Sequence, residues 1–352
     1  MKKTILLSFI VTLIFIFSQC ATSDVTVQMD INAKPFEKLS QYHFFTGKLA
    51  NLQANENVLE YELNSPLFSD YAHKKRFVWM PEGVSAKYDT KNMLDFPTGA
   101  VLIKNFYYEN DETNESAGKR IIETRLLVNR TKGWEGHSYV WNEKQTEAKL
   151  DIIGGVVSVN WKDVSGQAMH ANYIIPNKNQ CKGCHSYKQK ILPIGPKVRN
   201  LNRKFAYADG EKNQLDKWSE TGYLTGYNPT DQHQKAAQWD NPLDSLHSRA
   251  MAYLDINCGH CHNPHGPGGT TGLNLVYGAL LDLNVGVNKP PVASGRASGG
   301  RASSIVKGHP EKSIMTYRMA SDEPGVMMPE LGRTMVHEEG VLLITEWISK
   351  ME

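Results

Sequence analysis

Four of the five cysteines in this sequence fall in two copies of one short pattern, Cys-x-x-Cys-His. The first copy is Cys181, Cys184 and His185 in "QCKGCHS". The second is Cys258, Cys261 and His262 in "NCGHCHNPHGPGG". Residues i and i+3 share one face of a helical turn, so each copy presents two thiols on one side and an imidazole directly after them. Any fold of this chain must therefore support two such units.

The pattern is typical of c-type haem attachment. Its two thiols add to the two vinyl groups on one edge of a haem, and the histidine that follows binds the iron through an imidazole nitrogen. The sequence predicts two covalent c-type haems, one on each cysteine pair, with His185 and His262 as the proximal iron ligands.

Three other uses of paired cysteines fit less well. A zinc ribbon places its pairs about 15–20 residues apart, whereas 73 residues separate Cys184 from Cys258. A thioredoxin-like redox pair needs a βαβ context and leaves the histidine after both copies unexplained. A disulfide within Cys-x-x-Cys closes a very small loop and stabilises little.

The distal iron ligands are less constrained by the sequence. For the second haem we expect Met328 in "GVMMPELG", where Pro329 fixes the turn, with Met327 as the alternative. Both methionines are alternatively core residues. For the first haem the sequence leaves two alternatives. Either the iron has no sixth ligand, or the ligand is one of four side chains: His170, His233, His247 or Met251.

Two helices are predicted around the second copy. In "DSLHSRAMAYLDINCGHCH", apolar residues recur with helical spacing from Leu246 to Leu254, and Asn257 continues the same stripe; Asp244 or Ser245 caps the start. The glycines of "NPHGPGG" end it and let the backbone approach a flat ring. A last helix is predicted in "EEGVLLITEWISKM". Its apolar residues share one face: Leu343, Ile344, Trp347, Ile348 and Met351.

The N-terminus has the layout of a secretory signal peptide. "MKK" is followed by the uncharged apolar run "ILLSFIVTLIFIF" and then by Cys20. The run is shorter than the roughly 20 residues of a spanning helix. Cys20 resembles the lipidation site of bacterial lipoproteins. We therefore expect a signal peptide at 1–19, a lipidated linker at 20–35, and a mature chain anchored by lipid on the periplasmic side of a bacterial membrane, the outer membrane of a Gram-negative cell.

Residues 36–175 carry no haem motif and read as an antiparallel β-rich domain. Runs such as "KRFVWM", "GAVLIKNFYY" and "RIIETRLLV" are rich in β-branched and aromatic residues, and turn-forming residues separate them. Four tryptophans lie here, and we favour core packing over a ligand groove for them: Trp79, Trp134, Trp141 and Trp161. Pro176 and its neighbouring asparagines suggest a boundary near "YIIPNKNQ".

Several longer stretches resemble an uncharacterised family of bacterial dihaem c-type cytochromes. They are "PLFSDYAHKKRFVWMPEG", "DFPTGAVLIKNFYY", "PIGPKVRNLNRKFAYADGEKNQL", "AYLDINCGHCHNPHGP" and "GHPEKSIMTYRM…MMPELGR…LLITEWI". The likeness covers roughly residues 36–350. It implies two covalent haems on the motifs above, and it implies no particular substrate. Separately, the last hundred residues resemble the small cytochrome c fold.

The expected fold class is multidomain α+β. The β-rich domain would be followed, at 176–352, by a mainly helical cytochrome c-like domain, with the first haem at 176–238 and the second at 239–352. A chain of 352 residues allows two domains, and its net charge of +2 gives no field that would attract nucleic acid.

Three functions remain open at this stage. The first is electron transfer between unknown redox partner proteins through the two haems. The second is a haem enzyme of peroxidase or oxidase type, with the first haem as an open site. The third is a binding protein whose β-rich domain recognises a partner or a polysaccharide. No Ser/His/Asp set, phosphate loop or carboxylate pair is evident, so we assign no catalytic residue and favour electron transfer.

Overall fold

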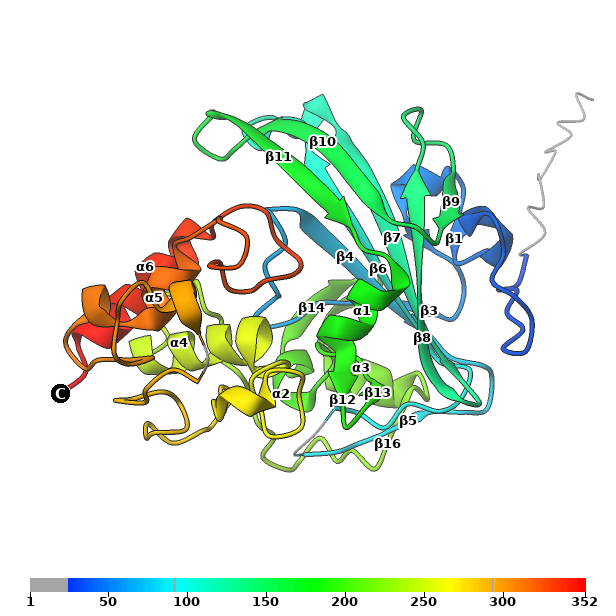
Figure 1. The fold of residues 1–352 in the computed structure, drawn as a ribbon. Helices are drawn as coiled ribbons and strands as arrows, with labels where there is room; N and C mark the ends of the chain where they lie inside the picture. The colour runs from blue at the N-terminus through cyan, green and yellow to red at the C-terminus, as the bar shows by residue number, and fades with distance from the viewer. Residues whose placement is uncertain (1–24, 91–92, 293) are drawn as a thin grey trace, which may run out of the picture.

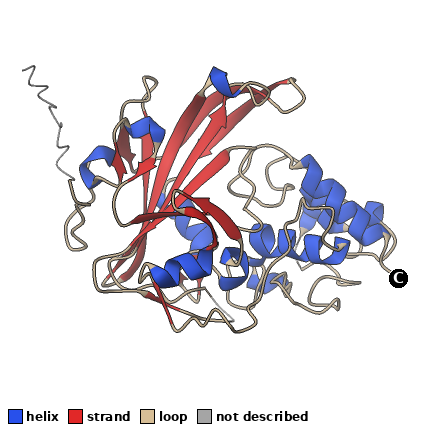
Figure 2. Ribbon diagram, turned by 180° about the vertical axis from the view of Figure 1, so that it is seen from behind, coloured by secondary structure: helices blue, strands red, loops and turns tan. Residues whose placement is uncertain are grey.

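The computed structural model describes residues 25–90, 93–292 and 294–352 (Figure 1). The predicted signal peptide at 1–19, Cys20 and the start of the linker lie outside the described residues. The described chain is a mixed α+β structure in which the strands gather on one side and most helices on the other (Figure 2).

A six-stranded antiparallel sheet forms the centre of the β-rich part, as the sequence predicts. Its strands occur in the order β3 (Val58–Tyr61), β4 (His73–Trp79), β6 (Val101–Glu109), β7 (Lys119–Arg130), β8 (Gly133–Trp141) and β9 (Ala148–Asp151). Neighbours in the sheet follow one another along the chain apart from the short strand β5 between β4 and β6, so this is a meander. Its connections range from two residues (131–132) to 21 residues (80–100).

Shorter strands pair outside this sheet. The antiparallel pairs are β1 (Phe45–Thr46) with β2 (Gln53–Ala54), β10 (Gly155–Lys162) with β11 (Ala168–Ile175), β12 (Ser186–Tyr187) with β13 (Lys190–Ile191), and β14 (Lys204–Tyr207) with β15 (Gly210–Asn213). One parallel pair joins β5 (Ala86–Lys87) to β16 (Leu224–Thr225).

The helices follow mostly in the second half of the chain. The α-helices are α1 (Lys178–His185), α2 (Val198–Leu201), α3 (Gln214–Glu220), α4 (Leu246–Leu254), α5 (Ile314–Met319) and α6 (Glu338–Ser349). Single 3₁₀ turns span Leu39–Tyr42, Leu49–Asn51, Glu115–Ala117, Gly269–Thr271, Gly295–Ser298 and Pro310–Lys312, and a π-helical turn spans Asp255–Gly259.

The central sheet packs on both of its faces. One face buries Phe77, Ile103 and Tyr139 under the N-terminal segment. The other face carries two separate apolar clusters, one around Leu102 and Trp218 and one around Phe106. Three of the four tryptophans, Trp134, Trp141 and Trp161, are buried in these clusters. Trp79 is partly buried and packs against the first face. Their use in the core is the interpretation that the sequence favoured.

Packing continues across the expected boundary at 175/176. The boundary coincides with the end of β11, but Leu201 and Trp218 from beyond it share one cluster with Tyr61 and Phe96 of the β-rich part. The hairpins β12–β13 and β14–β15 were not expected from the sequence, because strands of two to four residues leave too little periodicity to recognise.

The two predicted helices of the last third are confirmed. α4 begins at Leu246, and the Ser245 side chain accepts a hydrogen bond from the Ser248 backbone. α6 buries four of the five residues of the predicted face, whereas Met351 lies beyond its end at Ser349 and is only partly buried. α4 and α6 share one apolar cluster that includes Leu254 and Trp347. No helix among the described residues has the length and apolar character needed to cross a bilayer.

Candidate functional site

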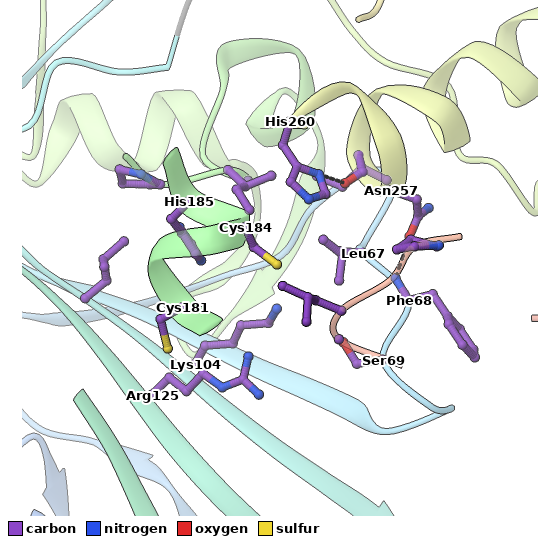
Figure 3. Close-up of a pocket in the computed structure, with 18 of the residues that line it drawn as sticks. Leu67, Phe68, Ser69, Lys104, Arg125, Cys181, Cys184, His185, Asn257 and His260 are labelled. Atoms are coloured by element: carbon purple, nitrogen blue, oxygen red, sulfur yellow. Dashed lines mark hydrogen bonds between the residues drawn. The ribbon is translucent and has the colours of Figure 1, made fainter. Parts of the chain in front are cut away.

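A large cavity lies between the central sheet and the helices that carry the two cysteine pairs (Figure 3). Its walls come from β4, β6, β7 and β8, from α1, from the segment around Phe68, from the start of the second motif, and from the loop at 328–333. The empty space between them, including the part open to solvent, is about 1640 Å³.

The whole first motif lines this cavity. Asn177 caps α1 by accepting hydrogen bonds from the backbones of Asn179 and Gln180, and the helix then delivers Cys181 and Cys184 one turn apart. All four cysteines that the structure describes carry free thiols. Burial raises the pKa of both thiols on α1. A nucleophilic redox cysteine has a lowered pKa instead, so these thiols do not have the character of a thioredoxin-type pair.

The His185 imidazole is fixed in one tautomer. Its Nδ1 lies 2.8 Å from the carbonyl oxygen of Leu192, which can only accept, so Nδ1 carries the proton. Burial lowers the pKa of His185 to about 4, which keeps the ring neutral at pH 7. Nε2 then holds a lone pair. Histidines that bind metal commonly donate their other ring N–H to a backbone carbonyl in this way.

The second motif begins in the cavity and continues out of it. The π-helical turn after α4 places Cys258 and His260 in the cavity wall, whereas Cys261 and His262 are not among the described lining residues. The pKa of the Cys261 thiol is raised to about 12 by burial, with contributions from Cys184 and Glu330. Cys181, Cys184 and Cys258 line the same cavity, so the two cysteine pairs are neighbours in space.

The His262 imidazole is also fixed with its proton on Nδ1. The Thr271 hydroxyl lies 3.1 Å from Nδ1 and donates its own hydrogen to the Gly268 carbonyl at 2.7 Å, so it accepts from the histidine. Gly268 lies directly against this ring, because a Cβ there would be 3.0 Å from Nδ1. The glycine-rich turn therefore fits around the imidazole, and Nε2 is left for another partner.

A buried ion pair joins the two motif segments. Asp255, in the turn before Cys258, receives three hydrogen bonds from the Arg199 guanidinium at 2.7–3.2 Å. Its Oδ1 also accepts from the Tyr277 backbone at 3.1 Å and lies 3.4 Å from Lys197. Asn257 links the second motif to the β-rich part, since its Oδ1 accepts from the Phe68 backbone at 2.8 Å (Figure 3).

The methionine loop reaches the same cavity. Met328 lines it, and Met327 is not among the described lining residues. Three residues further on, Leu331 packs so closely on the first motif that a Cβ at Gly183 would lie 3.2 Å from its Cδ1. Of the two methionines, Met328 is therefore the one that faces the motifs.

None of the four candidates for the distal ligand of the first haem is among the described lining residues. His170 bonds to Asn160 on the exposed hairpin, and His233 uses both ring nitrogens, on Tyr88 and on the Asn228 carbonyl. His247 accepts from the Trp347 indole, and Met251 is packed in the cluster of α4 and α6.

Three histidines that sequence reasoning did not select do line the cavity: His137 on β8, His260 and His337. His260 lies between the cysteines of the second motif, and its position inside the pattern was a usable signal. His337, ahead of α6, stacks on Phe68 with ring centroids 4.1 Å apart and bonds to the Tyr253 hydroxyl. Nothing in its local sequence distinguishes it from an ordinary helix-terminal histidine.

The residues present fit two haems of the attached type. Free thiols spaced one turn apart, with a following imidazole whose Nδ1 is already engaged, are the donor set that such a group needs. Within the part of the chain that the structure describes, no group of three or more His, Cys, Asp and Glu side chains is arranged to hold a metal ion by itself. No protein-family description, no curated protein and no solved structure matches this chain.

Proposed function

We propose that the protein is an exported dihaem c-type cytochrome that transfers electrons between redox partner proteins. Cys181 and Cys184 would hold one haem and Cys258 and Cys261 the other, with His185 and His262 on the irons. The bound haems would supply one-electron redox chemistry. The chain's own contribution is to attach them, fix their imidazoles and keep them close together.

The observation that carries the proposal is the pairing of the two motifs. They are far apart in sequence, yet they meet around one cavity, and in both the imidazole has Nδ1 bonded to a protein oxygen. Haems held by these residues would supply electron exchange without a substrate pocket between them. Met328, on the opposite loop, is a suitable sixth ligand for the second iron, and it would close that iron to small molecules.

Haem counting tests this proposal. Mature protein made with a c-type maturation system should weigh two haems more than its polypeptide and keep haem stain after denaturation. Replacing Cys181 and Cys184 by Ala should remove one haem, and the same change at Cys258 and Cys261 should remove the other. Stoichiometric zinc without a Soret band would refute it.

A haem enzyme is the second candidate, favoured by one observation. The cavity includes space open to solvent, and none of the expected sixth ligands for the first haem lines it. An open iron there would bind a small substrate. Adding cyanide separates the two functions, since a Soret shift of one haem indicates an open site and no shift indicates two closed electron carriers.

A further inference from the structure

The lining of the cavity is strongly cationic. Among the described lining residues there are five cations and no aspartate or glutamate: Arg76, Lys104, Arg125, Lys178 and Arg333. Three of these cations pair with carboxylates that lie outside the lining: Arg76 with Glu62, Arg125 with Glu123 and Lys178 with Glu135. Lys104 and Arg333 have no ion-pair partner among the described residues, and a buried cation of this kind is costly unless an anion lies beside it.

Three of these cations form one row across the sheet, the "cationic row" of Arg76, Lys104 and Arg125. Arg76 of β4 is the register partner of Lys104 of β6, and Lys104 is the register partner of Arg125 of β7. Like charges directly opposite each other on neighbouring strands destabilise a sheet. Lys104 has such a neighbour on both sides.

The row interrupts an otherwise apolar face. Along β6 on this face, Leu102 belongs to one hydrophobic cluster and Phe106 to another, with Lys104 between them. An apolar residue at position 104 would have joined the two clusters. The charge is placed where the face meets the cavity, and Figure 3 shows Lys104 and Arg125 reaching from the sheet toward the space beside Cys184.

Protein carboxylates compensate only the two ends of the row. Arg76 donates to Glu62 at 2.7 Å, and Arg125 donates to Glu123 at 2.9 Å through Nε. Lys104 has no carboxylate partner among the described residues, and its ammonium lies 4.6 Å from the centre of the Phe106 ring. The Arg76 side chain is only 3% exposed, and its Nη2 atom is buried without a hydrogen-bond acceptor. The row therefore holds one unpaired cation and one unused buried donor.

Burial, followed by the charges of Arg76, Lys74 and Arg125, lowers the pKa of Lys104 well below its ordinary value. An anion beside the ammonium would stabilise its charged form and raise this pKa.

We propose that the cationic row binds the propionate carboxylates of a haem held in this cavity, with Lys104 and the Nη2 of Arg76 as the primary donors. This rests on the proposed function, because a c-type haem is the occupant that brings carboxylates into an otherwise apolar cavity. It also gives the β-rich part a role: the sheet is one wall of the haem site.

A charge series at Lys104 tests the assignment in the protein carrying both haems. Haem content is measured first, so that a failure to attach haem is recognised separately as a failure of the proposed function. The variants are Lys104→Arg, Lys104→Met and Lys104→Glu. Their midpoint potentials are measured by spectroelectrochemical titration, and their propionate bending bands by resonance Raman spectroscopy.

A cation that neutralises a propionate favours ferrous iron, so one midpoint potential should stay near wild type in Lys104→Arg, fall in Lys104→Met and fall further in Lys104→Glu. The propionate band should shift in the last two variants. The matched control is Lys75→Met, because Lys75 lies on β4 with its side chain on the opposite face, paired with Glu60 at 3.2 Å. It should leave the band and both potentials near wild type.

Two results would overturn the proposal. One is a protein with both haems attached in which Lys104→Met and Lys104→Glu change neither the propionate band nor a midpoint potential. The other is a wild-type midpoint potential that shifts on adding acetate or phosphate, with the shift lost in Lys104→Met, since the row would then bind an exchangeable anion instead.

Discussion

The buried carboxylate of Asp255 should determine whether the two motif segments stay together. Asp255 is 2% exposed and Arg199 is 7% exposed, and three hydrogen bonds join them. In Asp255→Asn the guanidinium of Arg199 and the ammonium of Lys197 remain buried with no carboxylate. Breaking a buried ion pair from one side costs about 3–5 kcal/mol of folding free energy, and we expect a loss in this range.

Urea denaturation of the haem-loaded protein, followed by tryptophan fluorescence, measures this loss. Glu346→Gln is the matched control, because Glu346 bonds to Lys350 on the exposed side of α6. A surface pair of that kind contributes about 1 kcal/mol or less. The Asp255–Arg199 coupling is checked by a cycle with Arg199→Met, and the double variant should lose less than the sum of the two single variants.

The loss of stability in Asp255→Asn should depend on pH. Burial raises the pKa of Asp255, but Lys197 and Arg199 outweigh it and hold that pKa below its ordinary value of 3.8. A carboxyl with a lowered folded pKa stabilises the fold above its unfolded pKa and loses this effect as pH falls through the folded value. The difference between wild type and Asp255→Asn should therefore be full at pH 6 and shrink below about pH 4. Equal urea midpoints at pH 6, or a loss no larger than that of Glu346→Gln, would refute the reasoning.

Three further outcomes are expected. Met328→Ala should remove the weak far-red band of methionine–ferric iron ligation and lower one midpoint potential, whereas Met327→Ala should leave both unchanged; the reverse result would exchange the two assignments. Gly268→Ala should alter the electron paramagnetic resonance signal of the second haem, because its Cβ would press on the His262 ring, and Gly155→Ala, where a Cβ meets nothing within 4 Å, should not. Cys20→Ser should release the mature protein into the soluble periplasmic fraction or leave it unprocessed, and unchanged fractionation and migration would contradict lipidation.

The local elements around the motifs were predictable because their signals lie within a few residues. The helical spacing from Leu246 onward, the serine cap and the amphipathic α6 are each set by contacts three or four positions apart. The preference for Met328 over Met327 came from the proline after it, and Met328 is the one that lines the cavity. The strand runs of the β-rich part were visible for the same reason, through alternation and β-branched residues.

The cavity itself was not predictable, because it depends on register between distant strands. Nothing in "KRFVWM", "LIKNF" or "ETRLL" indicates that Arg76, Lys104 and Arg125 become direct neighbours; a shift of one residue in either pairing would turn one of them to the other face. The sequence therefore assigns the β-rich part no defined role, and it offers His170 and His233 as ligands without any information on where they lie in space. Those histidines bond elsewhere, and the sheet contributes the charged wall, so the chemistry that tunes the predicted haems is expected from a part of the chain that carries no haem motif.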